Sequence, residues 1–340
     1  MTQSRAEAEA GSLLFSPFQV GAVRLRNRIV MPPMKSNMDL AGPQARAYYG
    51  ERAAGGVGLV IVEATPLDQF EDPRLVEGLA ALAQVIHEGE AAAAIQLFHP
   101  GVIGGEHVAP SATGTAREAT AEEVALIPAL FADAAAKAQE AGFEGAEIHG
   151  AHGFFLNQFF SPRHNRRSDG WGGSLEGRMR LGVASARALR RKCRPDFLVL
   201  YRHTAASDYP LADSLVFAPQ LARAGVDIVD ISPSTSGEGE EHADLAAAVK
   251  AEVSCPVIAV GGMEDAEAAE AVLRQEKADL VAIGRPLIAD ADLPRKLQEG
   301  RGDEIVRCIK CDEKCFGNLR KGVPIGCTQN PRAGLEYQSA

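Results

Sequence analysis

Short apolar runs alternate with longer stretches rich in Ala, Leu, Glu and Arg along most of the chain. This alternation predicts repeated strand–helix units. Most of the runs are apolar without interruption, which is typical of parallel strands that are covered on both faces. Eight runs fit this description, at residues 28–34, 57–64, 91–98, 145–150, 197–203, 226–232, 256–261 and 279–284.

The stretches between the runs predict amphipathic helices, for example over residues 121–141 and 174–193. The pairs Gly55–Gly56, Ala141–Gly142 and Ala224–Gly225 stand where helices are expected to end, since glycine tolerates a left-handed backbone. Eight strand–helix units favour an α/β fold, a closed (β/α)8 or TIM barrel. A doubly wound open sheet is the alternative.

The composition is ordinary for a soluble globular protein, with 46% of the 340 residues apolar and 24% charged. No apolar run reaches the ~18 residues of a membrane span, so no membrane association is expected. Residues 1–12 are small and polar and lack the apolar stretch of a secretory signal, which predicts a disordered leader and a cytoplasmic location. We expect the barrel over residues 13–300 and a further segment over 301–340.

Charge and cysteine usage narrow the function classes. The formal net charge is −10 and the arginines are scattered, whereas nucleic acid binding needs clustered Lys and Arg. A small-molecule substrate needs only one or two local cations, and this is the partner we expect. Six cysteines are too few for a disulfide scaffold in a chain of this length, and four of them lie within residues 308–327.

The active site of such a barrel lies at the C-terminal ends of its strands. Glycines follow the last two predicted strands, at Gly261, Gly262 and Gly284, with Arg285 directly after the third. Glycine lets backbone N–H groups approach an anion closely, and barrels often bind phosphate at this place. The pattern therefore favours a phosphate site, and the alternative is that the glycines only form tight turns.

The sequence resembles the Old Yellow Enzyme family of FMN oxidoreductases from about Leu14 to Pro331. It is most similar to the iron–sulfur branch that includes 2,4-dienoyl-CoA reductase and trimethylamine dehydrogenase. The stretches that carry the resemblance are residues 14–34, 48–64, 95–101, 147–180 and 282–293, which follow the order and spacing of the family.

The resemblance implies a position for each part of the flavin. Pro33, Met34 and Ala64 would lie against the isoalloxazine ring, and Gln96 would hydrogen-bond its pyrimidine edge. Arg202 would lie near flavin N1, where a cation stabilises the reduced ring. The phosphate would be held by the residues after the last two strands, Gly261, Gly262, Gly284 and Arg285. For Arg202 the alternative is a salt bridge inside the barrel mouth.

His149 and His152 lie just past the fourth predicted strand. In the family such a pair holds the carbonyl oxygen of the substrate over the flavin. Two donors on this oxygen make the β-carbon a better hydride acceptor, because negative charge accumulates on the oxygen in the transition state. The pair is therefore expected to be catalytic, whereas a lone histidine would more often be structural.

Two residues depart from the family pattern. Phe154 stands where the family usually has a tyrosine that protonates the α-carbon, so another acid, such as His242, or solvent would have to act. Lys35 stands where the family has Thr, Cys or His beside flavin O4 and N5. We expect Lys35 to stabilise the reduced flavin or to bind an anionic substrate, and the alternative is that it points to solvent.

The spacing Cys308-x2-Cys311-x3-Cys315-x11-Cys327 can surround one metal centre. Four thiolates suit an iron–sulfur cluster or a structural zinc ion, and spacing alone leaves both open. The same spacing follows the barrel in dienoyl-CoA reductase-like proteins, where it holds a 4Fe–4S cluster. The resemblance therefore implies that residues 301–340 form an iron–sulfur segment.

These patterns together predict an oxidoreductase that reduces an activated C=C bond, of the enone or enoyl-CoA type, by hydride transfer from FMN. The alternatives are oxidation of an amine and an electron-relay subunit of a larger complex. No G-x-G-x-x-G follows a predicted strand, so we expect NAD(P)H to act indirectly, through a separate electron-transfer flavoprotein or ferredoxin. A homo-oligomer is also expected.

Overall fold

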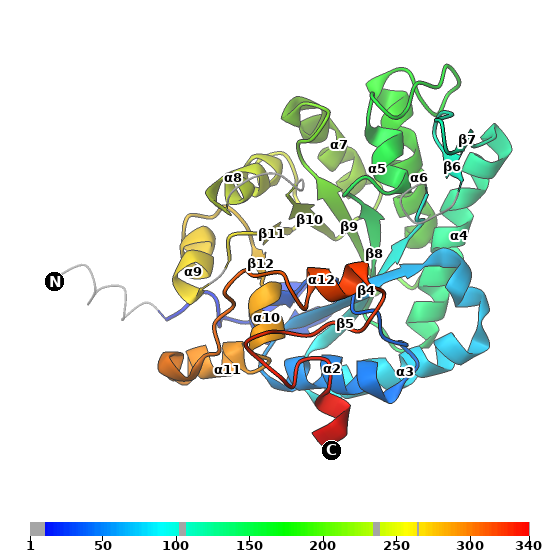
Figure 1. The fold of residues 1–340 in the computed structure, drawn as a ribbon. Helices are drawn as coiled ribbons and strands as arrows, with labels where there is room; N and C mark the ends of the chain where they lie inside the picture. The colour runs from blue at the N-terminus through cyan, green and yellow to red at the C-terminus, as the bar shows by residue number, and fades with distance from the viewer. Residues whose placement is uncertain (1–10, 102–106, 234–238, 264, 340) are drawn as a thin grey trace.

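Eight parallel strands close into a barrel in the computed structural model, which describes residues 11–101, 107–233, 239–263 and 265–339 (Figure 1). This confirms the (β/α)8 prediction, and the open sheet is wrong. Each predicted run overlaps one strand of the barrel. In order around the barrel, the strands are β3 (Ile29–Met31), β4 (Leu59–Pro66), β5 (Ala92–Phe98), β8 (Gly145–Gly150), β9 (Leu198–Thr204), β10 (Ile228–Ser232), β11 (Val257–Val260) and β12 (Leu280–Ala282).

The helices are arranged mostly around the outside of the barrel, and α12 belongs to the segment that follows it (Figure 1). They are α2 (Pro43–Ala54), α3 (Pro73–Glu88), α4 (Ala121–Glu140), α5 (Phe155–Phe160), α6 (Leu175–Lys192), α7 (Leu211–Arg223), α8 (Gly239–Lys250), α9 (Ala266–Arg274), α10 (Arg285–Ala289), α11 (Leu293–Gln298) and α12 (Phe316–Arg320). Short 3-10 turns are η1 (Leu67–Glu71), η2 (Gly302–Glu304) and η3 (Glu336–Ser339).

Local sequence explains where elements begin and end. A capping box of Thr120 and Glu123 begins α4, because each side chain accepts a hydrogen bond from the backbone N–H of the other residue. The expected glycine ends of α2, α4 and α7 are confirmed, with positive φ at Gly56, Gly142 and Gly225. The first run was predicted too long, because Pro32 has no N–H to continue the ladder beyond Met31.

The interior of the barrel is apolar at one end and polar at the other. Alternate residues of each strand point inward. The inward apolar cluster includes Leu59, Ile61, Ala94, Leu200 and Ile228, and it extends to Val20 and Leu25 of the hairpin formed by β1 (Phe18–Val20) and β2 (Val23–Leu25). Two positions further along their strands the inward residues become acidic, amide or basic. The polar end is the C-terminal end, where a site is expected.

Residues 305–339 return to the C-terminal end of the barrel, as the orange-to-red trace of Figure 1 shows. Ile325 N–H donates to Ser36 O, in the loop that follows β3, at 2.8 Å. Near the end of the segment, Arg52 of α2 forms a buried ion pair of 3.0 Å with Glu336. The segment is therefore attached to the barrel by both backbone and buried charged contacts.

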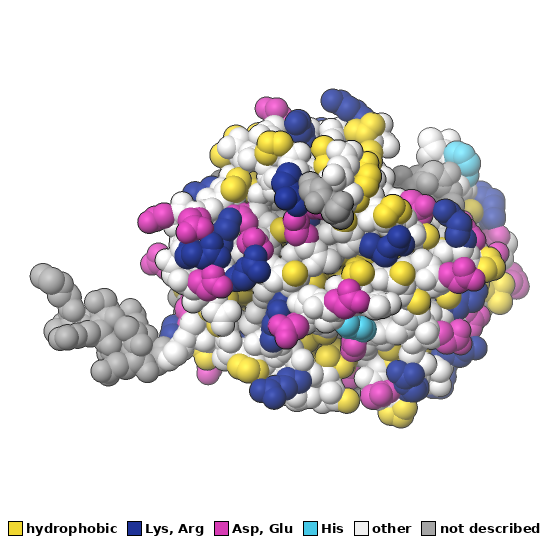
Figure 2. Space-filling view, turned by 90° about the horizontal axis from the view of Figure 1, so that it is seen from below, with side chains coloured by type: hydrophobic (Ala, Val, Ile, Leu, Met, Phe, Trp, Pro, Cys, Tyr) yellow, Lys and Arg dark blue, Asp and Glu magenta, His cyan; other side chains and the backbone are white. Residues whose placement is uncertain are grey.

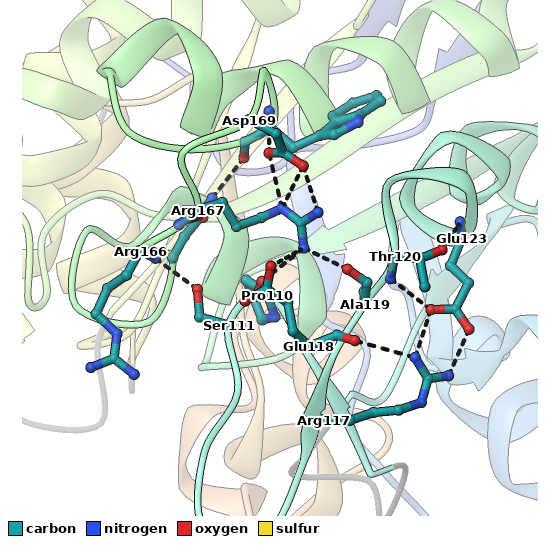
Figure 3. A network of polar contacts seen from close by, with 12 residues as sticks. Pro110, Ser111, Arg117, Glu118, Ala119, Thr120, Glu123, Arg166, Arg167 and Asp169 are labelled. Carbon is teal, nitrogen blue, oxygen red and sulfur yellow. Dashed lines mark hydrogen bonds and ion pairs between the residues drawn. The ribbon is translucent and has the colours of Figure 1, made fainter.

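An excursion after β5 carries β6 (Val108–Ala109) and β7 (Arg117–Glu118) and is held by the buried Arg167 (Figure 3). The Arg167 guanidinium donates to Pro110 O and Ala119 O at 2.9 and 2.6 Å. It also donates to both carboxylate oxygens of Asp169. One side chain thus ties the excursion to the loop that follows α5.

The surface carries no large area of one charge on the face seen in Figure 2, where basic and acidic side chains are interspersed. Within the described ranges, no helix is long and apolar enough to cross a membrane. Residues 1–10 of the predicted leader lie outside the described residues. Ser12, the last residue of that leader, is described, and its Oγ donates to Glu270 Oε2 at 2.8 Å.

Candidate active site

The polar residues predicted for the site come together at the C-terminal end of the barrel. Neighbouring strands place Gln96 beside Glu147 and His149 beside Arg202 in register. Arg202 is also in register with Asp230 of β10. Four consecutive strands, β5, β8, β9 and β10, therefore supply one polar wall.

The two histidines lie against each other above this wall. Their ring centroids are 5.1 Å apart and the ring planes are nearly perpendicular, at 82°. His152 has a left-handed backbone, with φ of 58°, which is uncommon for a residue other than glycine. This conformation is held by a hydrogen bond of 3.3 Å from its N–H to Thr204 Oγ1 and by a contact of 2.8 Å between Nε2 and Ser232 Oγ.

Both imidazoles are uncharged at neutral pH. Burial lowers the pKa of His149 well below its ordinary value, and the charges of His152 and Arg202 lower it further. Burial and the Arg202 charge lower the pKa of His152 to about 3. Each ring therefore has one nitrogen that donates and one that accepts.

Neighbouring donors decide which nitrogen carries the proton. Ala151 N–H donates to His149 Nδ1 at 3.3 Å, so the proton of neutral His149 is on Nε2. Arg202 Nη2 donates to Ser232 Oγ at 3.0 Å, and we assign the Ser232 hydroxyl as the donor to His152 Nε2. The remaining proton of His152 is then on Nδ1. The pair can present two N–H donors to one oxygen atom.

Sequence reasoning missed the acidic partners of Gln96 and Arg202. Gln96 Nε2 donates to Glu147 Oε2 at 2.6 Å, and Arg202 Nε lies 3.6 Å from Asp230 Oδ2. The salt bridge that was the alternative for Arg202 is thus present, and it leaves the hydrogen bond of Arg202 to Ser232 intact. A signal existed, because a lone acid inside an otherwise apolar run is rarely buried without a partner.

Lys35 is partly exposed and forms an ion pair of 2.6 Å with Glu63 Oε1, so it does not simply point to solvent. The side chain of Glu63 is fully buried, and its second oxygen accepts the Ser36 N–H at 2.7 Å. The half-buried Pro33, Met34 and Ala64 lie at the ends of the same two strands. Glu63 was also missed, for the same reason as the other acids.

The two glycines after β11 have left-handed backbone conformations that favour glycine, whereas Gly284 after β12 has a negative φ. Gly261 and Gly262 have φ of 98° and 73°. A Cβ on Gly261 would come within 2.5 Å of His242 Nδ1, and one on Gly284 would touch Met34 Sδ at 3.4 Å. His242, proposed as an acid, thus lies beside the glycine pair. Part of its loop, residues 234–238, is outside the described residues.

Arg285 points toward residues 305–339, called the cysteine segment from here on. Its Nη1 donates to Asp312 Oδ1 of that segment at 2.9 Å. Asp312 is a further residue that sequence reasoning did not identify. Arg285 therefore lies between the glycine turn after β12 and the cysteines, and it lines the same cavity as they do.

All four cysteines of the motif line one cavity together with Arg285. Gln329 N–H points at Cys327 Sγ at 3.4 Å, and Cys311 Sγ lies 3.2 Å from Thr328 Oγ1. Among the described residues, no three His, Cys, Asp or Glu side chains converge closely enough to hold a single metal ion. The thiols surround a space instead of meeting at one point.

Phe154 closes the apolar side of the histidine pair. Its ring centroid is 4.9 Å from His149 and 5.2 Å from Phe98. Phenylalanine has no proton to donate, so this position cannot act as an acid.

The chain belongs to the NADH:flavin oxidoreductase / NADH oxidase family, whose model matches residues 13–304. The resemblance to the Old Yellow Enzyme family of FMN oxidoreductases is confirmed, and this family implies a flavin and NAD(P)H. Membership of the iron–sulfur branch stays a prediction.

Several known proteins are similar over most of the chain. NADH oxidase of Thermoanaerobacter brockii is 36% identical over 95% of this chain and 56% of its own length. Cinnamate reductase of Clostridium sporogenes is 28% identical over 96% and 58%. NADPH dehydrogenase of Clostridium acetobutylicum is 35% identical over 81% and 91%.

Among solved structures, 6-hydroxypseudooxynicotine amine oxidase from Pseudomonas geniculata superposes with a TM-score of 0.88 at 27% identity, over 96% of this chain and 55% of its own. The chain thus spans little more than half the length of this protein, of the NADH oxidase and of the cinnamate reductase.

Proposed function

We propose that the enzyme reduces an activated C=C bond, of the enone or enoyl-CoA type, with FMN bound across the polar mouth of the barrel. The observation that carries this proposal is the pair of neutral donors formed by His149 and His152. A site for a substrate carbonyl needs two such donors, and their fixed protonation states suit one oxygen atom.

The residues at the mouth fit a flavin mononucleotide. The half-buried Pro33, Met34 and Ala64 offer main chain to a flat ring, and Gln96 and Arg202 offer donors at its polar edge. The turns at Gly261, Gly262 and Gly284 carry no side chain of their own, so their backbone N–H groups could be offered to a phosphate. Arg285 can serve the phosphate only if its bond to Asp312 is shared or broken.

A bound FMN would supply the hydride for the β-carbon of the substrate. The histidine pair then stabilises the enolate oxygen that develops, through His149 Nε2–H and His152 Nδ1–H. Lys35 is balanced by Glu63, so it acts as a hydrogen-bond donor held at the edge of the ring and not as an isolated positive charge.

The α-carbon must receive a proton from a group other than Phe154. His242 beside the glycine pair is the candidate on this chain, and solvent is the other source. Amine oxidation is the second candidate function, since it requires no such proton and a similar barrel belongs to an amine oxidase. The histidine pair favours reduction.

We further propose that Cys308, Cys311, Cys315 and Cys327 hold a 4Fe–4S cluster. Four thiols around one cavity and a backbone N–H aimed at Cys327 Sγ suit a cluster, whose sulfur ligands commonly accept such bonds. A structural zinc ion is the alternative, and metal analysis of the purified protein distinguishes it from an iron–sulfur cluster.

The cysteine segment presents a surface suited to a separate electron carrier. Cys311 is exposed, and Ile309 and Phe316 expose 59% and 47% of their surface beside it. The exposed Lys314 and Lys310 lie in the same segment. An electron-transfer flavoprotein or a ferredoxin would reach the cluster here.

Two variants test the proposed reduction with simple enones as substrates. His149→Ala should lower the turnover with an enone by about 10²-fold or more, because one donor to the enolate oxygen is removed. Phe154→Tyr should raise it, up to about 10²-fold, since a positioned acid accelerates such a proton transfer. Wild-type protein that oxidises amines and turns over no enone or enoyl-CoA, with no gain in Phe154→Tyr, would establish the second candidate.

A further inference from the structure

Two acidic side chains face each other inside the barrel, below the site. Glu147 of β8 and Asp230 of β10 are both 0% exposed and both continue an inward-facing series of their strand. Arg202 lies on the strand between them, in register with Asp230. The two carboxyl groups interact electrostatically, because each one affects the pKa of the other.

These carboxyl groups have buried acceptor oxygens without donors, unless one of the two groups carries a proton. Glu147 Oε1 and both Asp230 oxygens have no donor among the described residues. A carboxylate only accepts hydrogen bonds, so two adjacent carboxyl groups can satisfy one another only if one of them is protonated. A buried pair of adjacent negative charges is also unfavourable. One shared proton satisfies both requirements.

The surroundings supply a single positive charge. Burial raises the pKa of both acids, the Asp230 charge raises the pKa of Glu147 further, and Arg202 opposes these shifts. Two residues beyond Glu147 on β8 lies the neutral His149. On the other strands the inward polar groups are Gln96 and Glu63, which is paired with Lys35, and the residue of β11 in register with Asp230 is the apolar Ile258. One negative charge on the acid pair therefore balances Arg202.

We propose that Glu147 and Asp230 share one proton at neutral pH and act as positioning residues for the flavin site. The pair accepts from Gln96 Nε2 and so fixes which end of that amide faces a ligand. It also leaves Arg202 balanced by one negative charge instead of two. The second part of this inference rests on the proposed flavin site, whereas the shared proton does not.

Infrared spectroscopy of the flavin-free protein tests the shared proton directly. At pH 8 ordinary carboxyl groups are ionised, so the wild-type protein should show the carbonyl stretch of one protonated acid, shifted in D2O. Glu147→Gln and Asp230→Asn should each remove it, because the remaining acid then ionises beside Arg202. The control Asp303→Asn, on an exposed acid, should retain it. A wild-type protein without this band overturns the proposal, whether or not the variants fold.

The flavin midpoint potential tests the positioning role. Each single amide variant keeps the net charge and should leave the potential close to that of the wild type. The double variant Glu147→Gln/Asp230→Asn leaves Arg202 unbalanced and should shift the potential to more positive values. Single variants that shift it as far as the double one would overturn the role. If the protein binds no FMN, the proposed function fails while the infrared result still stands.

Discussion

At the scale of single residues, the proposed chemistry depends on side chains that are either kept neutral by burial or paired with an opposite charge. His149 and His152 are donors because burial and the neighbouring Arg202 keep them neutral. Lys35 and Arg202 each have an acidic partner, Glu63 and Asp230 respectively. The mouth therefore offers oriented hydrogen bonds and little uncompensated charge, which suits a transition state that develops charge on one oxygen.

The neutral histidines also predict how stability depends on pH. The pKa of His152 is about 3 in the folded protein, below its value of about 6.5 in an unfolded chain. Below pH 6.5 the unfolded state binds the proton and the folded state does not, so stability falls as pH falls. Between pH 7 and 5 this amounts to about 2 kcal/mol for one histidine.

Denaturant unfolding of the flavin-free protein at these two pH values measures the effect. His152→Asn should lose about 2 kcal/mol less stability than the wild type between pH 7 and 5. The exposed His107→Asn is the matched control and should follow the wild type. Equal losses in the wild type and in His152→Asn would mean that His152 is charged in the folded protein at pH 5.

At the scale of elements, the order and type of the strands could be predicted from the sequence. The contacts between residues far apart in the sequence could not. The eight strands were found because each is a continuous apolar run, and the glycine turns and histidines followed from the order of the strands. The buried acids could not be placed, because their partners come from other strands. Arg52 and Glu336, 284 positions apart, illustrate why the return of the last segment to the barrel was not foreseen.

The excursion after β5 should depend on Arg167 (Figure 3). Arg167→Ala leaves Pro110 O, Ala119 O and Asp169 without their donor, which should lower the free energy of unfolding by about 2–3 kcal/mol. The neighbouring Arg166 is exposed. Arg166→Ala should therefore change the free energy of unfolding by no more than about 0.5 kcal/mol. Equal effects of the two substitutions in denaturant titrations would contradict this role.

The cysteine segment is an element that should bind its metal independently of the flavin. Anaerobically purified protein should contain about four irons per chain. Cys311→Ala should lose this iron and keep most of its FMN, because the glycine turns after β11 and β12 do not involve the thiols. Metal analysis and flavin absorbance measure both. Stoichiometric zinc without iron would disprove the cluster.

At the scale of the whole molecule, the proposed function needs hydride transfer at the barrel mouth and single-electron transfer through the segment beside it. The Ile325 N–H donates a hydrogen bond to Ser36 O, and Ser36 is next to Lys35. The loop after β3 therefore contacts the cysteine segment and also carries a residue of the candidate flavin site. NAD(P)H alone should therefore reduce the flavin more slowly than the enzyme turns over with its carrier. Stopped-flow reduction by NAD(P)H that is faster than turnover, without any partner, would exclude the need for a carrier.

The direction of the flavin reaction is the most direct test of the central claim. The FMN-loaded protein is reduced photochemically under argon and mixed with an enone, cinnamate or an enoyl-CoA, and the oxidised protein is mixed with tertiary amines. We predict that at least one of the activated alkenes reoxidises the flavin in a single turnover, that His149→Ala slows this step, and that no amine reduces the oxidised flavin. Rapid reduction by an amine, with no reoxidation by any alkene, would contradict the account.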